Sequence, residues 1–197
     1  FETHVEPGAL ADRLEGPMRP GHFRGVTTVV TKLFGATAPR VAVFGQKDYQ
    51  QLALIRRLVT DLDLGVTIIG HPTVREADGL ALSSRNRRLT PPERIAARCG
   101  PRALAAVCDA VLGTPANQLV DVAGAVRRAR AIIDAEPLAT LDYVTVFDAS
   151  TLQAVERIDT DRRKPDQYRV AIAVRIGEVR LIDNAELFDR DLVEVVD

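Results

Sequence analysis

The chain has 197 residues, of which 46% are hydrophobic and 27% are charged, and its formal net charge at pH 7 is −1. Such a balance gives no long-range attraction for nucleic acid or an anionic membrane, and no apolar run approaches the roughly 18 residues of a membrane span. The first residues have no signal-peptide pattern, and two cysteines do not make a disulfide framework. We therefore expect a cytoplasmic protein.

Helix and strand patterns alternate along the first 72 residues, after a loop-like start over residues 1–21. The spacing of apolar residues predicts a helix over about 26–34, a strand at 41–44, a helix from Lys47 to about Asp63, and a strand at 66–69. Neither strand shows apolar–polar alternation, so the pattern predicts that both of their faces are buried. This order is typical of a parallel sheet flanked by helices, in which ligands bind beyond the carboxyl ends of the strands.

A different pattern follows Pro72. Thr90 and Glu93 form a capping box at the start of a helix. The predicted elements are helices over about 91–112 and 117–135 and strands at 143–147, 169–174 and 179–182, the last two joined by a turn. A helix pair with a small antiparallel sheet makes a separate α+β unit, so we place a domain boundary near residue 73. Cys99 and Cys108 lie nine positions apart in one predicted helix, on opposite faces, and cannot pair there.

Two polar segments have the residue types expected on the two sides of a site that binds nucleotide phosphates. Residues 44–51 (FGQKDYQQ) follow a strand and open a helix, where free backbone N–H groups and the helix dipole attract anions. Lys47 and Gln51 are four apart, which places them on one face if both are helical. Residues 82–86 (LSSRN) supply two hydroxyls and a guanidinium suited to phosphate oxygens.

The lysine of the first segment is unusual for this chain. Only three lysines occur against 23 arginines, so arginine is used wherever a generic cation suffices. A compact ammonium at Lys47 therefore indicates a point-charge contact with phosphate. By contrast, Arg56, Arg57 and the arginines over 127–130 are expected on solvated helix faces rather than against nucleic acid. No Cys/His group has metal-site spacing, so no metal held by the protein alone is predicted.

Three segments resemble the pantothenate synthetase family: residues 22–26 (HFRGV), 44–51, and 72–86 (PTVREADGLALSSRN). The resemblance covers nearly the whole chain and weakens after about residue 105. It implies an acid–amino-acid ligase that uses ATP, with Mg²⁺, to join pantoate to β-alanine. Pantoyl adenylate forms first with release of pyrophosphate, and the β-alanine amine then displaces AMP. The resemblance also implies an α/β fold, with the second half of a Rossmann-like nucleotide-binding domain over 1–72 and a smaller α+β lid domain over 73–197. The complete enzyme is expected to be a homodimer.

The resemblance assigns residue roles by position. The residues that match the ATP-binding positions are Gly45, Gln46, Lys47, Asp48, Val74, Leu82, Ser83, Ser84 and Arg85. Within them Lys47 lies near phosphate, Asp48 near ribose, and the Val74 backbone near adenine. Lys47, Ser83, Ser84 and Arg85 are the implied catalytic residues. Gln51 matches a pantoate-binding glutamine, and Gln46 stands where the family has a glutamate.

Two family features have no match among the 197 residues: a His-x-Gly-His phosphate motif and a second pantoate-binding glutamine. His4, His22 and His71 have the wrong spacing to substitute, and the only methionine is Met18. We therefore expect the chain to correspond to the back two-thirds of a synthetase and to be inactive by itself, with an unpaired strand edge and an open apolar surface at 41–44 or 66–69. Two alternatives remain: a chain that binds a nucleotide or a partner without turnover, and a nucleotidylyltransferase acting on another acid.

Overall fold

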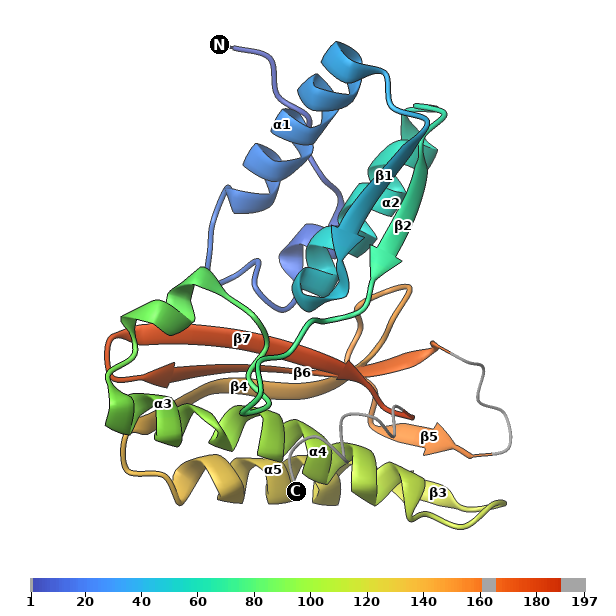
Figure 1. Cartoon of the computed structure of the whole chain (residues 1–197). Helices are drawn as coiled ribbons and strands as arrows, with labels where there is room; N and C mark the ends of the chain where they lie inside the picture. The colour runs from blue at the N-terminus through green and yellow to red at the C-terminus, as the bar shows by residue number, and fades with distance from the viewer. Residues whose placement is uncertain (1, 161–165, 189–197) are drawn as a thin grey trace. The chain divides into compact units, whose positions relative to one another are not determined.

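The computed structural model describes residues 2–160 and 166–188 (Figure 1). Internal contacts divide the chain into two compact units, which are described separately. The first unit is Phe1–Pro72 with Ser150–Leu152, and the second is Thr73–Ala149 with Gln153–Asp197. The predicted range 73–197 thus includes residues 161–165 and 189–197, which lie outside the described residues. No helix in the described part of the chain is long and apolar enough to cross a membrane.

The first unit has the predicted alternation of helices and strands. Its elements are the 3-10 turn η1 (Ala9–Asp12), α1 (His22–Thr37), β1 (Val41–Gly45), the 3-10 turn η2 (Gln46–Asp48), α2 (Tyr49–Asp61) and β2 (Thr67–His71). β1 and β2 pair in parallel, from Val41 opposite Thr67 to Gly45 opposite His71. The mixed α/β class and the parallel pairing are therefore confirmed.

A small apolar core fills one side of this two-stranded sheet. Ile55 and Leu58 of α2 pack with Val30 and Phe34 of α1, and strand residues such as Phe44 lie against them. The rings of Phe34 and Phe44 meet edge to face, with centroids 6.4 Å apart. Both helices thus contribute to the same core.

The other face of the sheet is open, so the prediction that both strand faces are buried is wrong. Val41, Val43 and Ile69 are 51%, 60% and 48% exposed. Successive strand side chains point to opposite faces, and the core packs against only one of them. Among the described residues β1 and β2 pair only with each other. The expected apolar surface beside an unpaired strand edge is thus present.

The second unit packs helices against an antiparallel sheet. Its elements are η3 (Ser84–Arg88), α3 (Pro91–Ala97), α4 (Cys99–Leu112), β3 (Leu119–Asp121), α5 (Val122–Asp134), β4 (Ala139–Asp148), β5 (Arg157–Asp159), β6 (Tyr168–Ile176) and β7 (Val179–Glu186). The main sheet has the order β4-β6-β7, and β3 pairs with β5. The predicted β6–β7 hairpin is confirmed, with Gly177 in the turn at φ +53°.

Three details of this unit differ from the sequence prediction. The helix predicted over 91–112 divides at Arg98, and the helix predicted over 117–135 is preceded by β3, which together with β5 was missed. The second unit also spans more of the chain than the first, so the expectation of a smaller second domain is wrong here. It holds two long helices and the three-stranded sheet, whereas the first unit has a sheet of only two strands.

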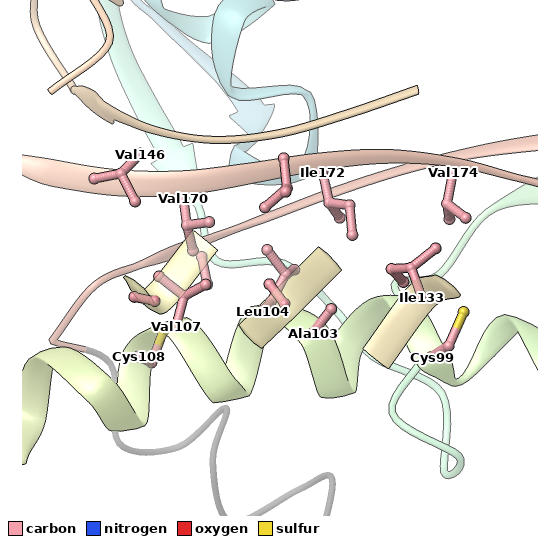
Figure 2. Close-up of a cluster of buried hydrophobic side chains, with 14 of the residues drawn as sticks. Cys99, Ala103, Leu104, Val107, Cys108, Ile133, Val146, Val170, Ile172 and Val174 are labelled. Carbon is pink, nitrogen blue, oxygen red and sulfur yellow. The ribbon is translucent and has the colours of Figure 1, made fainter. Parts of the chain in front are cut away.

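The core of the second unit lies between the helices and the sheet. Figure 2 shows Ala103, Leu104 and Val107 of α4 on the side of the helix that faces Val170, Ile172 and Val174 of β6. Leu104 and Ile133 have no exposed surface, and neither does Cys108, while Cys99 is 5% exposed. Both cysteines are free thiols, as predicted.

Candidate nucleotide-binding site

The first candidate segment lies where β1 ends. Gly45 is the last residue of β1, η2 forms a single 3-10 turn, and α2 begins at Tyr49. Lys47 therefore lies in the turn and not in the α-helix, so the prediction that Lys47 and Gln51 share an α-helical face is wrong. The backbone tightens into a 3-10 turn before the α-helical hydrogen bonds begin.

The Lys47 side chain is held close to the protein. Its exposed fraction is 16%, and Nζ lies 3.9 Å from Oδ1 of Asp48, whose side chain is 51% exposed. Gln46 and Gln51 are half-buried on either side of this turn. The first unit thus brings Gly45, Gln46, Lys47, Asp48 and Gln51 together within one strand-to-helix turn.

Gly70 allows α2 to lie close to β2 beside this turn. A Cβ atom at Gly70 would lie 2.9 Å from Cδ2 of Leu52 and 3.4 Å from Cγ of Gln46. A side chain there would displace the end of the Leu52 side chain, whereas Gln46 lies at an ordinary contact distance. Glycine therefore leaves room for the Leu52 side chain of α2 against β2.

Gln50 is a structural residue of this site that the sequence analysis missed. Its side chain is 5% exposed and donates to the carbonyls of Leu10 at 2.8 Å and Arg13 at 2.7 Å. Its Oε1 accepts the backbone N–H of Glu15 at 3.0 Å. This one amide fastens the segment before α1 to the first turn of α2. The clue was its position four residues before the buried Leu54, on the apolar stripe of the helix.

The second candidate segment begins as a narrow antiparallel turn. Leu82 N–H donates to the Val74 carbonyl at 2.8 Å, and Arg75 forms an isolated bridge with Ala81. The reversal occurs at Gly79, with φ +84°. Val74 and Leu82 lie opposite each other and are 51% and 55% exposed, which makes an apolar pair on one face of the turn.

The polar residues of the second segment follow directly. Ser83 precedes η3, and its Oγ accepts the backbone N–H of Arg85 at 3.3 Å. Ser84 and Arg85 are exposed. The second unit therefore brings Val74, Leu82, Ser83, Ser84 and Arg85 onto one loop.

Ion pairs that the sequence did not reveal hold this loop on both sides. On the sheet side, Arg75 binds both carboxylate oxygens of Asp183 in β7, at 2.8 and 3.2 Å, and donates to the Gly79 carbonyl. On the helix side, Arg94 of α3 binds Glu76 at 2.7 Å and Asp78 at 2.8 Å. Such paired guanidinium–carboxylate bonds are strong and geometrically specific.

Glu76 receives a second donor in addition to Arg94. The buried Nδ2 of Asn86 donates to its Oε1 at 2.6 Å. The hydrogen bonds from Asn86 and then Arg94 lower the pKa of Glu76, and the pKa of Arg94 is raised mainly by Glu76 and Asp78. Both groups are therefore ionised at neutral pH.

The described residues contain no group of three or more His, Cys, Asp or Glu side chains able to hold a metal ion. His22 instead lies 2.9 Å from a guanidinium nitrogen of Arg19, and His71 contacts the Pro72 carbonyl. Protein sites for Mg²⁺ commonly use few protein ligands and rely on substrate phosphates.

Comparison with known proteins identifies the family. The family model for pantoate–β-alanine ligase matches residues 1–186. The chain belongs to this family. Pantoate–β-alanine ligase relatives include the pantothenate synthetase of Heliobacterium modesticaldum, 50% identical over 93% of this chain and 62% of that protein. That of Rhizorhabdus wittichii is 46% identical, over 93% of this chain and 61% of that protein. The chain therefore spans about 61–62% of the length of these relatives.

Solved structures of the same family share the fold. Pantothenate synthetase from Thermus thermophilus superposes with a TM-score of 0.85 at 40% identity, over 96% of this chain and 65% of that one. Pantoate–β-alanine ligase from Francisella tularensis, in complex with β-γ ATP and β-alanine, superposes with a TM-score of 0.64 at 32% identity, over 95% of this chain and 59% of that one. The resemblance seen in the three sequence motifs is thus confirmed.

Proposed function

We propose that this chain serves in the ATP-dependent ligation of pantoate to β-alanine through a pantoyl adenylate, as an acid–amino-acid ligase. The observation that carries the proposal is the family match over residues 1–186, which includes both candidate segments. The ATP analogue and β-alanine held by the Francisella tularensis ligase support the same substrates here. We extend the proposal to a Rossmann-like domain over 1–72, a lid domain over 73–197, a cytoplasmic location and a homodimeric enzyme.

In this proposal the first segment binds the phosphates and pantoate. Lys47 places an ammonium at the turn after β1, where the N–H groups that begin α2 also favour negative charge. Asp48 lies at the exposed side of the turn and meets the ribose. Gln51, half-buried in the first turn of α2, donates and accepts hydrogen bonds to pantoate and orients its carboxylate toward the α-phosphorus.

The second segment binds the rest of the nucleotide. The exposed apolar pair of Val74 and Leu82 provides a face for the adenine ring, and Ser83, Ser84 and Arg85 bind phosphate oxygens. The pantoate carboxylate attacks the α-phosphorus and pyrophosphate leaves, so the protein supplies no covalent nucleophile. Catalysis is positioning together with neutralisation of charge on the phosphates, to which Mg²⁺ bound with ATP adds. The β-alanine amine then attacks the acyl carbon, and AMP leaves.

The test is titration of the 197-residue chain with the β,γ-methylene analogue of ATP, Mg²⁺ and pantoate. We expect binding of the analogue and of pantoate, and the absence of both would overturn the proposal. A panel of other acids in ATP–pyrophosphate exchange separates the ligase from a nucleotidylyltransferase with another substrate.

One observation favours a second candidate, a chain that binds nucleotide without turnover. The 197 residues contain no His-x-Gly-His motif, so the phosphate donors proposed here are those of the two segments described. Adenylation needs donors around the whole triphosphate. We therefore expect negligible AMP release from pantoate, β-alanine and Mg-ATP by the 197-residue chain. Robust turnover by a chain of verified mass would eliminate this candidate and retain the ligase.

A further inference from the structure

The side chains of the four-residue segment Leu82–Arg85 make few stabilising contacts. Leu82, Ser84 and Arg85 are exposed, and the hydrogen bond from Arg85 N–H to the Ser83 hydroxyl is long, at 3.3 Å. A loop that must aim hydroxyls and a guanidinium at phosphates needs support from neighbouring residues, because small displacements lose most of the benefit.

Asn86 supplies that support from inside the protein. It is 4% exposed, and its single amide nitrogen donates to Glu76 at 2.6 Å and to the Ala81 carbonyl at 3.0 Å. Its backbone N–H also donates to the Ser83 carbonyl at 3.1 Å. Ala81 and Asn86 flank Leu82–Arg85 directly, so this side chain joins the two ends of the segment.

The Glu76 carboxylate, which accepts a hydrogen bond from Asn86, is itself held in place. Glu76 uses Oε1 for Asn86 and Oε2 for Arg94 of α3, and Arg94 also holds Asp78. The loop is thereby connected through two hydrogen-bonded side chains to a helix. η3, which includes Ser84 and Arg85 of this loop, lies beside β7 of the same unit (Figure 1).

We propose that Asn86 is a positioning residue for ATP: it acts through Leu82–Arg85, and Glu76 with Arg94 fixes it in place. The inference rests on the proposed function of this loop. Asn86 itself points into the protein and does not contact the nucleotide. Removal of the Asn86 side chain releases the ends of the loop. It therefore weakens binding of a nucleotide that has β- and γ-phosphates far more than binding of a nucleotide that lacks them.

Asn184 offers a matched control. It is also 4% exposed, lies in the same unit, and its Oδ1 accepts Nε of Arg169 at 3.0 Å. Asn86→Ala and Asn184→Ala therefore each remove a buried amide with known hydrogen bonds. Both are expected to lower thermal stability, but only Asn86→Ala should alter the loop.

The experiment compares both variants with the wild-type chain in two measurements. In amide hydrogen exchange, the N–H groups of Leu82, Arg85 and Asn86 should exchange at least about tenfold faster in Asn86→Ala alone. In calorimetric titration, the β,γ-methylene analogue of ATP with Mg²⁺ should bind at least about tenfold more weakly to Asn86→Ala, with AMP affinity within about threefold of wild type.

Other outcomes are decisive as well. Equal affinity of the wild type and Asn86→Ala for the ATP analogue overturns the inference and leaves the proposed function intact. A wild-type chain that binds no ATP analogue overturns the inference, and one that binds no pantoate either overturns the proposed function as well. If Asn86→Ala does not fold, Asn86→Asp retains the size of the side chain but sets a carboxylate against Glu76. Unchanged affinity of a folded Asn86→Asp variant for the ATP analogue also overturns the inference.

Discussion

The two units of this chain bury their strands to different extents. In the second unit α4 and α5 cover the sheet, and nearly every β6 side chain is buried on both faces. In the first unit α1 and α2 share one core, and β1 and β2 alternate between half-buried and exposed residues. Yet β1 and β6 are both mainly apolar runs. Apolar runs therefore indicate strands reliably, but they do not tell how many faces are covered.

The largest expected effect compares a core residue of the second unit with an exposed residue of the first. Ile133→Ala removes a side chain with no exposed surface and should lower the free energy of unfolding by about 2–5 kcal/mol. Val43→Ala, at a position that is 60% exposed, should change it by less than about 0.5 kcal/mol. Urea denaturation of both variants measures the difference. Equal destabilisation would show that the open face of β1 is covered in solution.

The next prediction tests the burial of the two cysteine thiols, which both lie in the second unit. Burial raises the pKa of the Cys99 thiol from 9.0 to about 11. At pH 8 the folded chain then holds about a hundredfold less Cys99 thiolate than the unfolded chain, and both thiols should resist iodoacetamide until urea is added. The protonated thiol stabilises the fold below pH 9, and this contribution is lost as pH rises from 9 toward 11. Rapid alkylation of the native chain at pH 8 would contradict this burial.

A smaller effect tests the turn of the first unit. Lys47→Ala, and also Lys47→Arg, should weaken binding of the ATP analogue by at least about tenfold, because a bulky guanidinium does not replace a point charge in a tight turn. Lys32→Ala, on an exposed part of α1 in the same unit, is the control and should leave the affinity unchanged. Titration calorimetry measures all three variants. Wild-type affinity in both Lys47 variants would remove Lys47 from the site.

The smallest effect separates two adjacent glutamines. Gln51→Ala should weaken pantoate binding by roughly fivefold, the effect of about one hydrogen bond, and leave affinity for the ATP analogue within about threefold. Gln50→Ala should instead lower the stability of the first unit, because it releases the carbonyls of Leu10 and Arg13. Calorimetry and thermal unfolding of both variants provide the comparison. An equal loss of both ligands in Gln51→Ala would mean that the start of α2 was disrupted.

Local sequence patterns were sufficient to predict much of the fold. The α1–β1–α2–β2 order, the parallel pairing and the β6–β7 hairpin follow from residue spacing and turn residues within short windows. The break at Arg98 and the short β3–β5 pair carry no comparable pattern, since they depend on packing against distant segments. Lys47 was placed in a helix because periodicity cannot distinguish a 3-10 turn from the first turn of an α-helix.

In the candidate site, too, local motifs were predictable from sequence and distant contacts were not. The residues that we propose to meet ligands could be assigned from sequence because the motifs around Lys47 and Ser83 are long and ordered. The residues that hold them were missed: Arg75 and Asp183 are 108 positions apart in sequence, and Asn86 and Glu76 are ten apart. Contacts at such separations leave no periodicity in the sequence, so only the folded chain reveals them.

The amide of Gln50 has a consequence for the order in which the first unit assembles. Its bonds to Leu10, Arg13 and Glu15 close loops of 35 to 40 residues, and a loop of that length costs chain entropy before any contact is gained. We therefore expect the segment before α1 to be ordered only after the first turn of α2 has formed, and to be released early on unfolding.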